Sequence, residues 1–272
     1  MRAAIIYRLN VLGLLLFMVL GCKDINKKDA LALANYKPNL PAQSTDNSPN
    51  LKWKKWVNSA LDSLPHLYTE NAYKIASDGT IIQGKAALLD HYKKQEFQIE
   101  EIRTKIRITA VLNTTIQYEI GGFSTTDKAD YSHLIIWRKG DGVLKRELEM
   151  IVKGSADVPT SALNEIEKRR EEWIRLCQLH KAEDLVNALY SEHTLYYNHR
   201  PMIIGRNAVI QEYQYMNNPN YNLHLTPIEI KLVSPNIAYE IGQCSGSYPG
   251  NYVLIWHKAL DGEWRILMDS NI

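Results

Sequence analysis

The feature that most constrains this chain is an internal repeat. The stretch IQYEIGGFS over residues 116–124 recurs as IAYEIGQCS over residues 237–245, with six of nine letters identical. The likeness extends to both sides, since TIIQGKAALLDHYKKQ before the first stretch matches PMIIGRNAVIQEYQYM before the second. A repeat of this length indicates a duplicated structural unit. The 272 residues therefore hold two domains that follow each other along the chain.

Each copy reads as helices followed by strands. Apolar residues recur at helical spacing over residues 53–64, and polar and apolar letters alternate in the two IxYEIG stretches. Asp141-Gly142 and Asp261-Gly262 predict tight turns between strands. Runs of helix followed by runs of strand predict an α+β class, with the helices of each domain packed on a strongly curved antiparallel sheet.

The N-terminus reads as an export signal. Arg2 and Arg8 precede an apolar run that is too short to span a bilayer comfortably, and this run ends at Cys22. The tetrad Val19-Leu20-Gly21-Cys22 resembles a bacterial lipobox, in which the peptide is cut before the cysteine and the cysteine carries the lipid. The alternatives are a plain secretory signal, or a short buried helix with a chance cysteine.

These features give four segments. We expect a lipoprotein signal peptide over residues 1–21 and a lipidated Cys22 with a flexible polar tether over residues 22–50. A divergent first domain then covers residues 51–153, and a second domain covers residues 161–272. Asp24 does not directly follow the cysteine, so retention at the inner membrane is not signalled, and analogy favours a lipid anchor at the outer membrane of a bacterial envelope.

Net charge and cysteine content limit the kinds of partner and of cysteine chemistry that the sequence predicts. Residues 1–21 hold two arginines and no acid, so the rest of the chain balances 30 basic against 30 acidic residues. This balance argues against nucleic acid as a partner, because that contact needs a basic patch. Cys177 and Cys244 would form either a disulfide or two small buried thiols, and we favour the thiols. No spacing predicts a metal site, and no cofactor is expected.

The order of the elements resembles the nuclear transport factor 2-like superfamily, and within it the SnoaL-like domains. The likeness rests on four stretches of the second copy: HKAEDLVNALYSEHTLYY, PMIIGRNAVIQEY, YEIGQCSG and DGEWRILMDSN. The resemblance implies a cone, in which a bent sheet and helices enclose an apolar cavity. It also implies a range of activities, from isomerases related to ketosteroid isomerase, polyketide cyclases and dehydratases to binding modules without catalysis. Many members dimerise through their sheets, so we expect the two copies to form an intramolecular pseudo-dimer.

Three residues of the second copy are candidates for acid–base chemistry, which would need a base and a donor aimed at the cavity. His199 and Asp269 are the candidate bases, and Tyr213 is a candidate donor. Each has a plainer interpretation: a solvated turn histidine, a solvated terminal aspartate, and a core aromatic with its hydroxyl at the rim.

Four more residues are candidates for ligand contact: Tyr196, Tyr252, Trp256 and His133. Tyr196 would also be an alternative donor. The plainer interpretation of Trp256 is a large core side chain. The acids of the repeated stretch alternate with its tyrosines, so they lie on the opposite face of their strands. If the Ile-Tyr-Ile face is the core, Glu119 and Glu240 are solvent or interface residues with ionic partners.

The sequence supports three functions. The leading one is an envelope lipoprotein that binds a small apolar or mixed ligand, or a protein partner, without catalysis. The alternative is an isomerase, dehydratase or cyclase that uses the cavity of the second domain without a cofactor. The third is a structural role in which both lobes are filled. No acid–histidine pair recurs in both copies, and this favours binding over catalysis.

Overall fold

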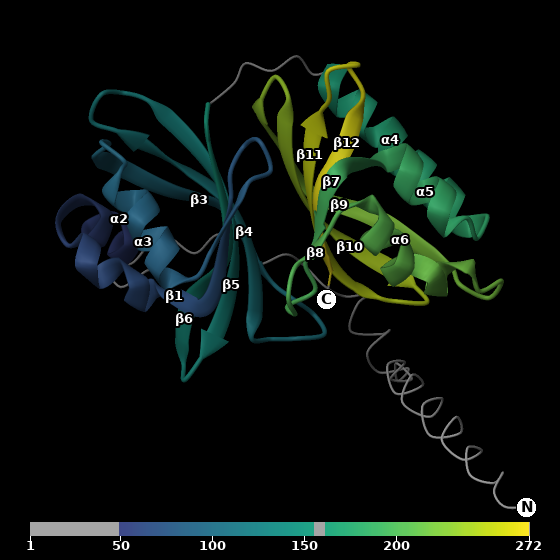
Figure 1. Ribbon diagram of the computed structural model, residues 1–272, viewed down its shortest axis with the longest axis horizontal. Helices are drawn as coiled ribbons and strands as arrows, with labels where there is room; N and C mark the ends of the chain where they lie inside the picture. The colour runs from purple at the N-terminus through teal and green to yellow at the C-terminus, as the bar shows by residue number, and fades with distance from the viewer. Residues whose placement is uncertain (1–48, 155–160, 272) are drawn as a thin grey trace, which may run out of the picture.

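A computed structural model describes residues 49–154 and 161–271 (Figure 1). The predicted signal peptide, the lipidated Cys22 and nearly all of the tether lie outside the described residues, so these expectations remain predictions. Among the helices of the described ranges, none is both long enough and apolar enough to cross a bilayer.

The first half, here called the first cone, is a six-stranded sheet with helices on one side. Its strand order is β2-β1-β6-β5-β4-β3. Its elements are α2 (Pro49–Ser59), the 3₁₀ helix η1 (Leu61–Leu67), β1 (Tyr68–Ile75), β2 (Ile81–Gln83), α3 (Lys85–Lys93), β3 (Ile99–Thr109), β4 (Ile116–Thr125), β5 (Asp130–Gly140) and β6 (Val143–Lys153).

The second half, here called the second cone, repeats this plan. Its strand order, β8-β7-β12-β11-β10-β9, matches the first position by position, so the tandem α+β prediction is confirmed. Its elements are α4 (Ser161–Gln178), α5 (Ala182–Leu189), β7 (Tyr190–Tyr196), β8 (Ile203–Ile204), α6 (Arg206–Glu212), η2 (Tyr213–Asn217), β9 (Leu223–Ser234), β10 (Ile237–Gly246), β11 (Gly250–Lys258) and β12 (Trp264–Asn271).

The sheets are mixed rather than purely antiparallel. Strand β1 pairs in parallel with β6, and β7 pairs in parallel with β12. The sequence did not predict β1 or β7, because charged and polar residues interrupt the alternation of apolar and polar residues that is typical of a strand. Each of these two strands follows the first helices of its cone and pairs with the last strand of its sheet.

Local chemistry explains the turns and the curvature. Asp141 and Gly142 both have positive φ, 49° and 77°, as a tight two-residue hairpin requires. Bulges fall at matching places, between Ile136 and Trp137 in the first sheet and between Ile255 and Trp256 in the second. A bulge bends its strand and increases the local twist, so both sheets curl around their helices.

The two sheets turn their outer faces toward each other (Figure 1). Side chains from both sheets share one buried cluster, which includes Tyr118 and Ile120 of β4 and Tyr239 and Ile241 of β10. The Tyr239 hydroxyl donates to the Met150 carbonyl of the other sheet at 3.3 Å. The Ile-Tyr-Ile faces therefore form the contact between the lobes, and helices cover the opposite faces.

This arrangement corrects the placement of the repeated acids. Glu119 and Glu240 were expected at solvent or at an interface, but both are fully buried inside their own cones. The expectation failed because both faces of each sheet are buried, so an apolar face did not identify the inside of the cone. The expected pairing does occur, since Glu119 meets Arg107 and Glu240 meets Arg170.

Candidate functional site

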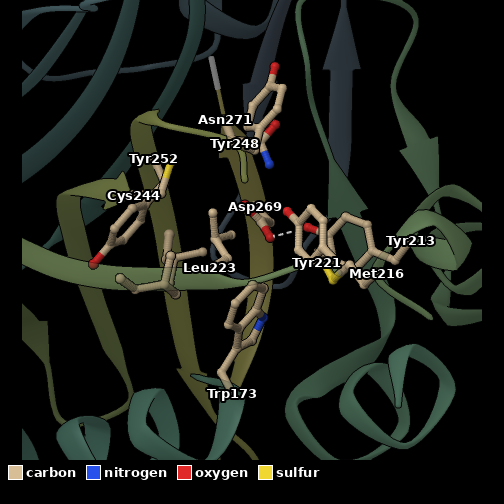
Figure 2. A pocket seen from close by; sticks show the side chains of 12 residues that line it. Trp173, Tyr213, Met216, Tyr221, Leu223, Cys244, Tyr248, Tyr252, Asp269 and Asn271 are labelled. Carbon is tan, nitrogen blue, oxygen red and sulfur yellow. Dashed lines mark hydrogen bonds between the residues drawn. The ribbon is translucent and has the colours of Figure 1, made fainter. Parts of the chain in front are cut away.

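The second cone encloses a small cavity between its helices and its sheet (Figure 2). Its volume is about 20 Å³, which is enough for one water molecule. The walls are aromatic and aliphatic, apart from one acid, one amide and one thiol. The lining residues are Trp173, Tyr213, Met216, Tyr221, Leu223, Leu225, Cys244, Tyr248, Tyr252, Leu254, Asp269 and Asn271.

Asp269 on β12 is the acid in this wall, and two tyrosines hold it. The Tyr190 hydroxyl donates to Oδ2 at 2.7 Å, and the Tyr213 hydroxyl donates to the same oxygen at 2.5 Å. The Trp173 indole donates to the Tyr190 hydroxyl at 3.0 Å, which fixes the direction in which that hydroxyl donates. Within residues 49–154 and 161–271, the side-chain hydrogen bonds to this carboxylate all go to Oδ2. Oδ1 is left for another donor.

Burial changes the proton affinity of this group. Loss of hydration raises the pKa of Asp269 to about 6, and the hydrogen bonds from Tyr213 and Tyr190 offset only part of that effect. Burial also raises the pKa of both tyrosines well above the ordinary value, so they stay protonated and act as donors. A carboxyl with a pKa near neutrality, facing a cavity, can either hold a ligand or exchange a proton with it.

Glu240 on β10 is a second buried acid in this cone, and it is fully satisfied. It accepts from Arg170 Nε at 2.8 Å, from the Tyr252 hydroxyl at 2.6 Å and from Trp256 Nε1 at 2.8 Å. These bonds turn the Tyr252 hydroxyl toward the glutamate and leave its ring along the cavity wall. Glu240 thus positions part of the wall, and the other acid is the one that faces the cavity.

The first cone contains the same arrangement around Glu149. The Tyr68 hydroxyl donates to Glu149 at 3.0 Å, Tyr92 donates to its other oxygen, and Trp53 Nε1 donates to the Tyr68 hydroxyl at 3.1 Å. Strand register makes the correspondence explicit. Glu149 pairs across β5 with Ile135, as Asp269 pairs across β11 with Leu254. Both cones therefore hold a Trp–Tyr–acid–Tyr set.

Two cations distinguish the first cone from the second. Lys74 Nζ lies 3.0 Å from Glu149 Oε1, and Arg146 lies 2.7 Å from Oε2. Burial favours a raised pKa for Glu149, but these charges outweigh it and lower the pKa to about 2. The register places Tyr196 where the first cone has Lys74, and Ile266 where it has Arg146. The second cone thus keeps the acid but replaces both cations with uncharged side chains.

A third difference between the cones is the size of one buried side chain. In the repeated stretch, Phe123 of the first copy corresponds to Cys244 of the second. The Phe123 ring is fully buried, stacks on Tyr131 at 4.8 Å and contacts Trp53 at 5.4 Å between centroids. Cys244, with its much smaller side chain, lines the cavity instead. It is a free thiol, as is Cys177, and burial raises the pKa of Cys244 to about 12, so it is not a reactive thiolate.

Four of the residues selected from sequence lie at this site. Asp269, Tyr213 and Tyr252 line the cavity. The Tyr196 ring packs edge-on against Tyr213 at 5.4 Å, and its hydroxyl donates to Asn271 at 3.0 Å. Trp256 is fully buried and donates to the buried glutamate of β10, and it is not among the residues that line this cavity.

The two histidines lie elsewhere. His133 is buried in the first cone, with Nε2 3.1 Å from Glu119. His199 lies where the lobes meet, with φ of 63° and Nδ1 bonded to Glu147 of the first cone. The structure therefore does not bring His199 and Tyr213 together around one cavity, and the acid–base pair of the sequence hypothesis reduces to Asp269 and a tyrosine.

Sequence reasoning missed Tyr190, Trp173 and the whole Glu149 set. A signal was present: Trp53 and Trp173 lie 120 residues apart, as do Glu149 and Asp269, close to the offset of the repeat. The substitution of Glu for Asp and the unpredicted strands β1 and β7 concealed it. Among the described residues, no group of His, Cys, Asp and Glu is arranged to hold a metal ion.

Fold and site define a protein of two tandem cones, one of which has at its cavity a buried acid that forms no ion pair with any described residue. No protein-family model and no curated protein matches the sequence. Similar solved structures include nuclear transport factor 2-like proteins and a ketosteroid isomerase-like protein.

Three of these structures illustrate the likeness. A nuclear transport factor 2-like protein of unknown function from Shewanella oneidensis MR-1 is 18% identical, with a TM-score of 0.36 over 40% of this chain and 98% of its own. A ketosteroid isomerase-like protein from Erwinia carotovora atroseptica SCRI1043 is 14% identical, with a TM-score of 0.36 over 42% and 98%. A nuclear transport factor 2-like protein from Cytophaga hutchinsonii ATCC 33406 is 13% identical, with a TM-score of 0.32 over 39% and 92%. At these identities the likeness is one of fold and says nothing about activity.

Proposed function

We propose that the second cone is a binding lobe for a small, largely apolar ligand that carries one polar group, and that the first cone is its structural partner. The observation that carries this proposal is the buried Asp269 carboxylate, which faces an aromatic cavity with one oxygen not engaged by the described side chains. Binding sites of this kind are mostly apolar, with a few placed polar groups that orient the ligand.

The ligand must displace side chains as it enters, because the cavity itself has room for about one water. Tyr248 is the best placed to move, since it lies between β10 and β11 and is 41% exposed. Figure 2 shows it among the side chains that line the cavity. Tyr221 forms the neighbouring part of the wall. A swing of Tyr248 toward solvent would open the cavity without disturbing the hydrogen bonds of Asp269.

A fragment screen by ligand-observed nuclear magnetic resonance tests this proposal. The matched variant is Cys244→Phe, which gives the second cone the ring that Phe123 supplies in the first. We expect small aromatic or aliphatic alcohols and amines to bind the native protein, and Cys244→Phe to reduce binding at least tenfold. A screen without binders, or binding unchanged in Cys244→Phe, would refute the proposal.

The raised pKa of Asp269 favours one further candidate, a proton-transfer enzyme of the isomerase or dehydratase type. Asp269 would take a proton from a bound substrate, and Tyr213 would donate a hydrogen bond to the charge that develops. An activity found for this protein would then fall steeply in Asp269→Asn with little change in KM. Equal activity in Asp269→Asn would exclude this role.

We also propose that the protein is anchored to the bacterial envelope through a lipid on Cys22. The support is the Val19-Leu20-Gly21-Cys22 tetrad behind a basic and apolar leader. Metabolic labelling with an alkyne fatty acid should mark the native protein and fail to mark Cys22→Ala. Labelling of both proteins, or of neither, would contradict the anchor.

Finally, we propose that the two lobes stay docked in solution as an intramolecular pseudo-dimer. The support is the buried cluster that both sheets share, together with ion pairs such as Lys105–Glu229 at 2.6 Å. Small-angle X-ray scattering should give the dimensions of a single docked pair. A profile typical of two independent lobes would contradict this proposal.

A further inference from the structure

We propose that the polar group of the ligand is a positive charge, so that the second cone binds a small organic ammonium ion at Asp269. This inference rests on the proposed binding function and specifies its chemistry. The comparison within the chain carries it: the first cone has an equivalent acid held by an equivalent pair of tyrosines and a tryptophan, and it has its own cations in place.

The donors around the two acids differ in number. Glu149 has one tyrosine and one cation on each carboxylate oxygen: Tyr92 and Lys74 on Oε1, and Tyr68 and Arg146 on Oε2. Asp269 has its two tyrosines on Oδ2. In the described chain, therefore, the second cone lacks the two charged donors, and Asp269, which lines the cavity, has one oxygen to which no side chain donates.

Aromatic rings surround the place where the cation would lie. In the first cone, Lys74 Nζ lies 5.0 Å from the centroid of the Tyr92 ring, and the Arg146 guanidinium lies 4.1 Å from that of Trp53. The equivalent rings of the second cone are Tyr213 and Trp173, and both line the cavity. Aromatic faces attract cations, and a cage of such rings with an acid is a typical ammonium site.

The charge of the buried acid in each cone also favours a positively charged ligand. A buried carboxylate without a counter-ion is unfavourable, and either protonation or a cation can relieve it. The first cone relieves it with Lys74 and Arg146. In the second cone, a ligand that brings a positive charge gains an ionic hydrogen bond that a neutral ligand of the same shape does not. The cavity should therefore discriminate by charge more than by shape.

A matched set of three probes tests this inference on the purified protein: propylammonium, 1-propanol and propionate, titrated by nuclear magnetic resonance at pH 7.5. We expect propylammonium to bind at least tenfold more tightly than 1-propanol, and propionate to bind most weakly. Asp269→Asn should remove the preference for the cation while 1-propanol still binds. Asp184→Asn, which removes an exposed acid on α5, should leave all three affinities unchanged.

A second variant makes the internal comparison direct. Tyr196→Lys places an ammonium where the first cone has Lys74, and it should abolish propylammonium binding. Equal binding of 1-propanol and propylammonium would overturn the cation inference and leave the proposed binding function intact. Binding of none of the probes would overturn both. A preference for propylammonium that persists in Asp269→Asn would place the cation elsewhere and overturn the inference.

Discussion

Asn in place of Asp269 should make the protein more stable at neutral pH, although it removes the acid of the candidate site. The pKa of this carboxyl rises from its ordinary value of 3.8 to about 6 on folding. That difference corresponds to about 3 kcal/mol, because each pKa unit is equivalent to about 1.4 kcal/mol. An Asn oxygen still accepts from Tyr190 and Tyr213, but its amide group must also find a partner. The expected net gain is about 1–3 kcal/mol.

The sign of the pH dependence follows from the direction of the shift. The folded protein binds a proton at Asp269 more tightly than the unfolded chain does, so folding is penalised when the group is ionised. The penalty is fully present above pH 6 and is relieved as the pH falls toward 4. The advantage of Asp269→Asn should therefore be largest at pH 7.5 and approach zero near pH 4.

The first cone provides a control of opposite sign. The pKa of Glu149 falls from 4.5 to about 2 on folding, so its ionised form stabilises the fold above pH 4.5, and this contribution is lost as the pH falls toward 2. Glu149→Gln would also leave Lys74 and Arg146 buried without their acid. We expect a loss of about 3 kcal/mol or more at pH 7.5.

Guanidinium unfolding of both variants, followed by tryptophan fluorescence at pH 7.5 and pH 4, measures these differences. Each cone contains three of the six tryptophans, so the unfolding of either lobe changes the fluorescence. If the lobes unfold in separate transitions, each transition is fitted alone, since a single free energy then has no meaning. Asp269→Asn that destabilises the protein at pH 7.5, or an effect that does not change with pH, would refute the reasoning.

Three further outcomes can be measured by thermal or chemical unfolding. Arg170→Met should cost about 3 kcal/mol, because it leaves the Glu240 carboxylate buried without a cation. Gly242→Ala should cost about 1–3 kcal/mol, because a Cβ there would lie 2.1 Å from the Tyr252 ring; unchanged stability would show that the ring moves freely. His199→Ala should cost about 1–2 kcal/mol by weakening the contact between the lobes, while fragment binding in the second cone stays unchanged. Loss of that binding would show that His199 contributes to the binding site of the second cone.

The fold could be predicted because the sequence patterns of its main elements occur in both copies of the repeat. The IxYEIG strands, the Asp-Gly turns and the amphipathic helices all follow local rules, and each occurs in both copies. Strands β1 and β7 do not follow such a rule. Residues such as Glu70 and Glu192 interrupt their apolar pattern, and their parallel partners lie more than 70 residues away. Pairing over that distance is a property of the whole sheet.

The site could be predicted only in part. Asp269 and Tyr213 were selected for their residue type and approximate position, whereas Tyr190 was missed because its strand was missed. The expected placement of Glu119 and Glu240 at solvent or at an interface was wrong because strand alternation separates two faces without saying which one is enclosed by helices. Here the tandem partner buries the outer face as thoroughly as the helices bury the inner one.

Three differences between the cones act in the same direction. Lys74 and Arg146 neutralise the acid of the first cone, and Phe123 fills space there. Their counterparts leave the acid of the second cone ionisable and the adjacent space open. The first cone shows that lysine and arginine can be accommodated at these positions, so the uncompensated acid of the second cone is not imposed by the fold. Local costs that a fold can avoid and yet retains are typical of functional sites. The comparison within one chain therefore supports the proposal that the first cone stabilises the fold and the second cone binds a ligand.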